Sequence, residues 1–182
     1  MSTLYSRRRA VELGVALLTS AGMVHPASAQ IGGGQMTGET GIAVVRGLIQ
    51  NVFNAHDPSV APRYFTPDFR WHGGSVGDYE GVESYAKVMS GFWTALPDAH
   101  ATELDAFEAG DRVTMRFRVE ATHRGALWGI APTGRRVRWD AVMIYRMLAS
   151  KIAEQWAAED WCAILRDLNV FDPPFANPGG AR

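Results

Sequence analysis

The sequence predicts an α+β fold in which helices come first and a curved antiparallel sheet follows. Apolar residues recur at helical spacing in residues 42–54 and 81–96, whereas residues 113–123 and 136–147 alternate between apolar and polar side chains. Because the strands follow the helices instead of alternating with them, βαβ units are not expected. A curved sheet with helices packed on one face leaves a pocket between the two layers.

The first 29 residues have the layout of a cleavable export signal. Three arginines, Arg7 to Arg9, precede an apolar run that ends before Ala27-Ser28-Ala29, a small-residue cleavage site. The run is shorter than the ~20 residues of a spanning helix, so cleavage is favoured over a membrane anchor. Ser6 followed by arginines also resembles a twin-arginine signal. We therefore expect an exported protein, periplasmic or secreted, without membrane contact after cleavage.

The rest of the chain divides into three parts. Residues 30–41 are Gly-rich and poor in apolar side chains, which predicts a flexible leader. Residues 42–169 carry the periodic patterns and form the predicted domain, and residues 170–182 are a Pro/Gly-rich tail. A domain of this length can bury a core without disulfides. The single cysteine, Cys162, is expected to be a buried apolar thiol.

Charge and motif spacing exclude several classes of function. The formal net charge is −1, and three arginines lie in the export signal, so the mature domain is more acidic still. This argues against nucleic acid or an anionic membrane as the partner. The histidines of the domain lie too far apart in sequence for a local metal-ligand motif. We expect no metal and no cofactor.

The helical half is expected to contain two long helices and a short strand. Residues 42–54 form the first helix, and Asp57-Pro58 ends it or begins another short one. A Pro-Asp turn then leads into an aromatic strand, residues 69–72. Residues 81–96 form the second long helix, which Pro97 stops.

The sheet half is expected to contain four strands and a closing helix. The strands cover residues 99–108, 113–123, 136–147 and 152–161, and the helix covers residues 162–168. Alternation assigns two apolar faces, which consist of Val113, Met115, Phe117, Val119, Ala121 and His123, and of Val137, Trp139, Ala141, Met143 and Tyr145. Asp160 stands just before the closing helix and is expected to cap it.

The segment between the two central strands is Gly-rich and ends in Arg135 and Arg136. A phosphate-binding loop needs a lysine followed by Ser or Thr and then a helix, whereas here Gly134 leads into a strand. Pro132 and Gly134 are typical of turns, which predicts a plain connection between strands. An anion site at Arg135, Arg136 and Arg138 stays an alternative to solvated strand-end charges.

Several motifs occur here in a characteristic order. They are Pro-Asp-Phe-x-x-His at 67–72, Gly-Asp-Arg-Val at 110–113, Thr-His-x-Gly at 122–125, Gly-Ile-Ala-Pro-Thr-Gly at 129–134, Tyr-Arg at 145–146, and Lys-Ile-x-Glu-x-Trp at 151–156 followed by Asp160. Together they resemble the signature of the SnoaL-like ester cyclases, a polyketide cyclase family, over residues 42 to about 169.

The resemblance implies the cone-shaped α+β fold of the nuclear-transport-factor-2 superfamily, with N-terminal helices on the concave face of the sheet. It also implies a homodimer and a deep apolar pocket. The characterised cyclases close a ring in an aromatic polyketide ester by an intramolecular aldol reaction, without metal or organic cofactor.

The chain departs from these cyclases at two positions. The resemblance implies an acid/base Asp on the last long strand and a helper His on the strand before it. An ungapped match from Pro132 onward puts these positions at Ala157 and Met143, and neither side chain can transfer a proton. Fold and reaction are therefore separate questions for this chain.

Other residues are candidates for the proton-transfer groups. Strand parity sends Gln155 and Glu159 to the same side as Met143 and Ala157. His123 ends the matching inner face, and His72 ends the first strand, near the expected mouth of the pocket. We predict His72, His123 and Glu159 as the catalytic set. Each has a plainer alternative, since a strand-end His is often solvated and Glu159 is open to solvation beside Asp160.

The predicted ligand is a small hydrophobic compound. Several tryptophans around one pocket suit a flat apolar molecule. The predicted substrate-binding residues are Trp71, Trp93, Trp139, Met143, Gln155 and Trp156. An enzyme with this site would perform acid/base chemistry (cyclisation, isomerisation or hydration) on a carbonyl compound. A non-catalytic binding protein of the same fold is the alternative, and a purely structural dimer is a third interpretation.

Overall fold

The computed structural model describes residues 40–171, in which helices precede strands as predicted. The export signal, most of the leader and most of the tail lie outside the described residues. The α+β class is confirmed. Within the described part, no helix has the length and apolar character needed to cross a membrane.

The helical elements form the first half of the domain and close it at the end. They are α1 (Gly41–Leu48), the π-helical turn η1 (Ile49–Asn54) that continues it, the 3-10 turns η2 (Pro58–Arg63) and η3 (Gly74–Val76), α2 (Gly81–Ala95) and α3 (Trp161–Asp167). The Asp160 side chain accepts a hydrogen bond of 3.0 Å from Ala163 N, which confirms the predicted cap of α3.

Within residues 40–171, six strands form one sheet in the order β2-β1-β6-β5-β4-β3. They are β1 (Phe65–His72), β2 (Asp78–Glu80), β3 (His100–Ala109), β4 (Arg112–Thr122), β5 (Arg136–Leu148) and β6 (Lys151–Glu159). The alternation did not reveal β2, because three residues are too few to show a period.

One strand pair corrects the expectation of an antiparallel sheet. β1 pairs with β6 in parallel, whereas the other neighbours are antiparallel. Antiparallel neighbours can follow one another through short hairpins, but β1 and β6 are separated by most of the domain. No hairpin therefore fixes their relative direction.

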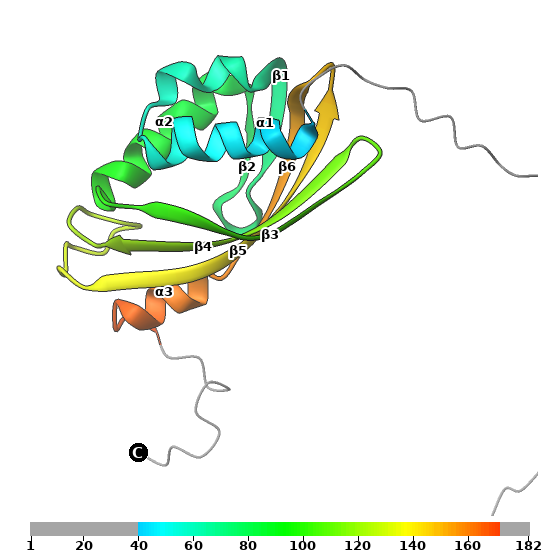
Figure 1. Cartoon of the computed structure of the whole chain (residues 1–182). Helices are drawn as coiled ribbons and strands as arrows, with labels where there is room; N and C mark the ends of the chain where they lie inside the picture. Colours follow the sequence, from blue (N-terminus) through cyan, green and yellow to red (C-terminus); the bar gives the residue numbers. More distant parts are fainter. Residues whose placement is uncertain (1–39, 172–182) are drawn as a thin grey trace, which may run out of the picture. The chain divides into compact units, whose positions relative to one another are not determined.

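Helices α1 and α2 cover one face of the curved sheet (Figure 1). α2 contacts β1, and α1 contacts β3, β4 and β6. The core lies between these layers, where Val45 and Leu48 of α1 and Phe117 of β4 are almost fully buried. Helix α3 packs against β5 beyond the end of β6, and the Asp167 side chain accepts a 3.0 Å hydrogen bond from Arg138 N there.

Residues 123–135 connect β4 to β5, as predicted, and they are anchored on α2. Arg124 N and Gly125 N both donate to Ala95 O, at 2.9 and 3.0 Å. A Cβ on Gly125 would collide with the backbone of Thr94, which explains the glycine. The connection is therefore a fixed part of the fold.

The tip of this connection is a tight turn around Trp128 and Gly129. Leu127 and Ile130 exchange two backbone hydrogen bonds, of 3.0 and 2.8 Å, across the turn. Both central residues have positive φ, 50° at Trp128 and 82° at Gly129. Gly adopts this region freely, whereas for tryptophan it costs roughly 1 kcal/mol or more.

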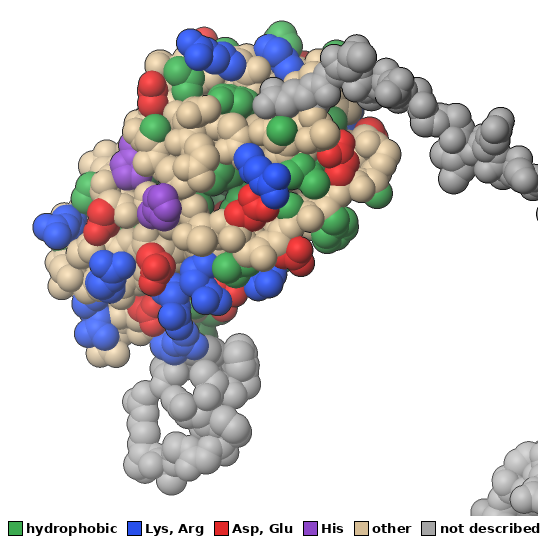
Figure 2. Space-filling view, in the orientation of Figure 1, with side chains coloured by type: hydrophobic (Ala, Val, Ile, Leu, Met, Phe, Trp, Pro, Cys, Tyr) green, Lys and Arg blue, Asp and Glu red, His purple; other side chains and the backbone are tan. Residues whose placement is uncertain are grey.

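Cys162 is exposed, which corrects the expectation of a buried thiol. In the short helix α3 its neighbours Ala163 and Ile164 are the residues that face the core. One face of the helix is enough to bury these two, so Cys162 is left on the solvent side. Figure 2 shows acidic and basic side chains intermixed on the face of the domain that is turned to the viewer.

Candidate functional site

A cavity, the inner pocket, lies between the helices and the concave face of the sheet. Its volume is about 60 Å³, the space of roughly two water molecules. Apolar and aromatic side chains form most of the wall, with Ile49 and Phe53 contributed by η1. A π-helical turn often occurs at functional sites, and here it carries two residues of the pocket wall.

The register of β5 and β6 decides which sheet residues meet in the inner pocket. Tyr145 pairs with Gln155, Met143 with Ala157, and Ala141 with Glu159. Met143, Gln155 and Glu159 were predicted to face the pocket, and all three line it. Glu159 lies two residues beyond Ala157, and it is the carboxylic acid of the inner pocket.

Glu159 is held by Trp139 in a mostly apolar environment. Trp139 Nε1 donates to Glu159 Oε2 at 2.9 Å. Burial raises the pKa of Glu159 to about 7, against the opposing effect of the Trp139 hydrogen bond. Both protonation states are therefore populated near neutral pH, which suits a general acid or base.

Two tyrosines of the inner pocket, Tyr85 and Tyr145, were not predicted as site residues. Burial raises the pKa of both phenols, and the charge of Glu159 raises it further. They therefore stay protonated and can donate hydrogen bonds. The alternation placed Tyr145 on the inner face and the helical period included Tyr85, but the same patterns describe ordinary core residues.

Gln155 is the remaining polar side chain of the inner pocket. It is buried, and its Nε2 donates to Met143 Sδ at 3.4 Å. A thioether sulfur is a weak acceptor, so a ligand oxygen would be a better partner for this amide. The inner pocket thus combines a titratable acid with the hydrogen-bond donors of Tyr85, Tyr145 and Gln155.

The structure brings five of the predicted residues together. Those that line the inner pocket are Trp71, Trp139, Met143, Gln155 and Glu159. Their roles stay predictions, but they share one cavity although they come from strands that are distant in sequence.

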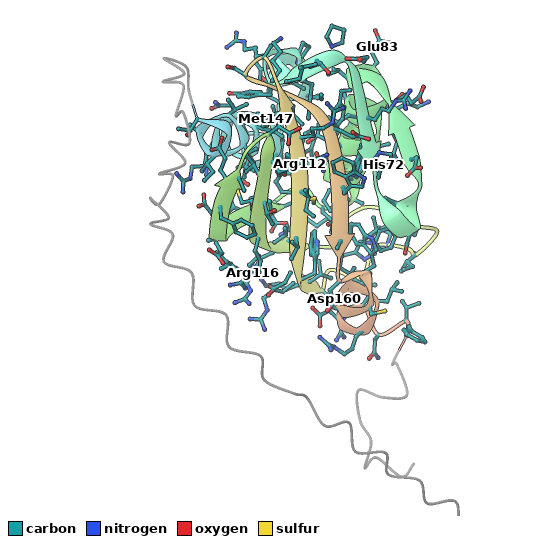
Figure 3. All side chains as sticks on the ribbon, turned by 90° about the vertical axis from the view of Figure 1, so that its right-hand side faces the viewer. His72, Glu83, Arg112, Arg116, Met147 and Asp160 are labelled. Atoms are coloured by element: carbon teal, nitrogen blue, oxygen red, sulfur yellow. The ribbon has the colours of Figure 1, made fainter. Side chains whose placement is uncertain are left out.

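His72 and Trp156 lie on the opposite, outer face of the sheet. Their rings stack at 5.3 Å, and His72 Nε2 is 2.9 Å from Glu154 Oε1. The guanidinium of Arg112 lies over the Trp156 ring at 4.9 Å (Figure 3). The expected position of His72 near the pocket mouth is therefore wrong. Side chains alternate between the two faces along a strand. Trp71 faces the inner pocket, so its neighbour His72 faces outward.

His123 and Trp93 are buried but do not line the inner pocket. His123 Nδ1 accepts a hydrogen bond from Thr133 N at 3.3 Å, which ties the ring to its own loop. Trp93 stacks on His56 at 5.2 Å, beside η1. The predicted acid/base set is thus divided, and of its three members Glu159 alone is in the inner pocket.

Metal binding finds no support in the part of the chain that the structure describes. No group of three His, Cys, Asp or Glu side chains gathers there in a way that would hold an ion.

Comparison with known proteins gives one family. The sequence model of the SnoaL-like polyketide cyclases matches residues 43–168. No functionally curated protein matches the chain.

Two solved structures illustrate the similarity. AclR from Streptomyces galilaeus, described as a candidate hydroxylase, is 27% identical, with a TM-score of 0.65 over 72% of this chain and 97% of its own. IdmH from Streptomyces antibioticus, described as a candidate polyketide cyclase, is 26% identical, with the same TM-score over 72% of this chain and 100% of its own. The two descriptions name different reactions on similar folds, so the fold does not select the reaction.

Proposed function

The chain belongs to the SnoaL-like polyketide cyclase family, and from this premise we propose that it is a cofactor-free acid/base enzyme acting on a small hydrophobic carbonyl compound. The proposal rests mainly on Glu159. Its carboxyl group lies in an apolar pocket, where burial raises the pKa of the group to about 7. A purely structural carboxylate is usually paired with a cation, whereas Glu159 receives a neutral indole N–H.

The reaction begins with proton abstraction next to a carbonyl group. The ionised Glu159 takes the proton from the α-carbon, and the electrons of the C–H bond form an enolate. The enolate oxygen accepts hydrogen bonds from Tyr145, Tyr85 or Gln155, which stabilise the developing charge. No oxidant, reductant or external proton source is required.

The second step determines which reaction results. In a cyclisation, the enolate carbon attacks a second carbonyl carbon of the same molecule and forms the C–C bond. Protonated Glu159 then returns its proton to the new alkoxide. In an isomerisation, Glu159 returns the proton to a different carbon. Both reactions use Glu159 first as a base and then as an acid, which requires that its pKa lie near the working pH.

The position of Glu159 compensates for the lost acid at Ala157. Glu159 lines the inner pocket. Alternation along β6 puts Ala157 on the same face, and a spacing of two residues along a strand is roughly 7 Å. The glutamate side chain is one methylene longer than aspartate and bridges part of this distance. We propose that the catalytic carboxylate has moved by one pleat along the same strand.

Hydrogen–deuterium exchange at an activated carbon tests the proposal without knowledge of the natural substrate. Ethyl benzoylacetate is incubated in D2O with the protein, and loss of the α-proton signal is followed by NMR. We expect exchange above the buffer rate for the wild type, and exchange at the buffer rate for Glu159→Gln. Glu83→Gln is the matched control, because Glu83 is exposed in the first turn of α2 (Figure 3) and should leave the rate unchanged.

A binding protein without catalysis is the alternative, favoured by Met143 and Ala157 at the family's acid/base positions. It predicts that ethyl benzoylacetate and related aryl ketones bind while exchange stays at the buffer rate in wild type and variants alike. Exchange that is fast and independent of Glu159 would contradict the assignment of the base.

A further inference from the structure

A second hollow, the outer groove, opens beside the inner pocket. Its volume is about 590 Å³, and it shares Phe92 and Trp161 with the inner pocket. Pockets that bind drug-sized ligands have volumes of roughly 300 to 1,000 Å³. The inner pocket, with about 60 Å³, admits only a small end of such a molecule. A larger substrate that reaches Glu159 would therefore keep most of its body outside the inner pocket, and the outer groove is the hollow next to it.

The chemistry of the outer groove indicates a neutral, flat ligand. Its described lining residues carry no formal charge at neutral pH, and four of them are aromatic: Tyr79, Phe92, Trp128 and Trp161. An ionised ligand would lose its hydration there without gaining a counter-charge. A flat aromatic ligand would gain ring contacts at several points.

Three tryptophans connect the outer groove to Glu159. The rings of Trp128 and Trp161 are 5.2 Å apart and nearly perpendicular, and those of Trp161 and Trp139 are 6.2 Å apart. Trp139 in turn holds the Glu159 carboxyl group. An aromatic ligand that lies along these three tryptophans would point one of its ends towards Glu159, the proposed base.

Trp128 is one of five described non-Gly residues with positive φ, and it combines this backbone strain with an exposed aromatic side chain. It has a φ of 50°, and its side chain is 47% exposed at the edge of the outer groove. Gly or Asn would adopt this turn position more easily. The turn is held by the paired hydrogen bonds of Leu127 and Ile130 and lies beside the end of α2 (Figure 1). Strain in a large, exposed residue is a mark of a functional position.

We propose that the outer groove binds the body of a neutral, flat aromatic substrate, and that Trp128 selects this substrate by packing against its ring. The proposal rests on the proposed function for the other end of the molecule, which enters the inner pocket beside Glu159. The rigid anchoring of the connection on Ala95 keeps the Trp128 wall in place before the ligand arrives, which lowers the entropy lost on binding.

Binding of a neutral propionyl(dimethylamino)naphthalene fluorophore tests the role of Trp128. We expect the emission of this probe to shift to the blue with the wild type. Trp128→Gly should raise the Kd about tenfold, and Trp128→Phe should keep it within about threefold of the wild type. Because glycine relieves the positive φ, Trp128→Gly should unfold at the same temperature as the wild type or higher. A merely structural tryptophan would instead lower the unfolding temperature.

Two further measurements guard against non-specific binding. Phe107→Ala removes an aromatic side chain that is 60% exposed on β3, and it should leave the Kd unchanged. The anionic anilinonaphthalene sulfonate should bind at least about tenfold more weakly than the neutral probe, since no cation lines the groove. Equal binding of the two probes, or unchanged binding to Trp128→Gly, overturns the proposal.

The proposed function and the proposed role of the outer groove can be refuted independently of each other. If the wild type binds the neutral probe through Trp128 but catalyses no exchange of ethyl benzoylacetate, the proposed function is wrong and the groove stands. If exchange depends on Glu159 while Trp128→Gly changes neither the probe Kd nor the KM for the ketoester, the groove is wrong and the proposed function stands.

Discussion

Trp139 Nε1 donates a 2.9 Å hydrogen bond to Glu159 Oε2 from the neighbouring strand of the sheet. An indole N–H can only donate, so this contact favours the ionised carboxylate. The apolar walls of the inner pocket favour the neutral acid more strongly, and the pKa is raised to about 7. The pair therefore keeps the acid in place near neutral pH without fixing its protonation state.

The raised pKa of Glu159 predicts a pH-dependent change in stability. The native carboxyl group titrates at about 7 and the unfolded one at 4.5, so the native state binds more protons between these values. The free energy of unfolding therefore falls as pH rises through this window. Glu159→Gln removes the effect and should gain up to roughly 3 kcal/mol over the wild type at pH 8, and little at pH 4.5.

Urea unfolding of the wild type and Glu159→Gln at pH 4.5 and 8 measures this difference. Glu83→Gln, an exposed substitution of the same kind, should show no such pH dependence. A stability difference that is equal at both pH values would show that Glu159 titrates normally.

Tyr145 is expected to stabilise the enolate. The side chain is buried in the inner pocket, and its raised pKa keeps the phenol protonated and able to donate. Tyr145→Phe should lower kcat for exchange by about 100-fold with a smaller effect on KM, because the charge develops only in the transition state. An unchanged kcat, measured by the same NMR assay, would assign the donor role to Tyr85 or Gln155.

His72→Ala should retain the exchange rate of the wild type within about twofold. The ring lies on the outer face, bonded to Glu154 and stacked on Trp156, so it cannot reach a substrate in the inner pocket. The substitution should lower stability by about 1 kcal/mol through the loss of these contacts. Loss of exchange in a folded His72→Ala protein would contradict this geometry.

The outer face of the sheet is expected to form a homodimer interface. A row of paired residues crosses this face, in which Thr114 lies between Phe107 and Ile144, and Ile144 pairs with Trp156. Three of its four side chains are apolar or aromatic. Ile144 is 41% exposed and Phe107 60% exposed. Ile144→Asp should convert a dimer into a monomer in light scattering coupled to size-exclusion chromatography. A monomeric wild type at micromolar concentration would refute the expectation.

Export is expected to remove the first 29 residues. When the whole chain is produced in a bacterium with intact export pathways, intact-mass analysis should find a product that begins at Gln30. Replacing Ala27 and Ala29 by larger residues should block the processing. A soluble product that keeps its basic N-terminal segment would argue against a cleaved signal.

The hydrophobic periods and the strand parity of the sequence predicted much of the fold and part of the candidate site. The family resemblance pointed to Met143 and Ala157 as pocket positions, and alternation along β6 added Gln155 and Glu159, because side chains of a strand alternate whatever its partner. The same rule, applied to β1, would have separated Trp71 from His72. The prediction instead placed His72 by its position at the end of the strand, and that position does not report on which face a residue lies.

What the sequence alone determined is therefore local and periodic: the helices, the long strands, the cap at Asp160, and the family to which the chain belongs. What only the tertiary structure decided is which groups meet. The parallel pairing of β1 with β6, the contact of Trp139 with Glu159, and the position of Trp128 beside Trp161 join residues distant in sequence. Their contacts depend on how the layers pack, and no local period encodes that packing.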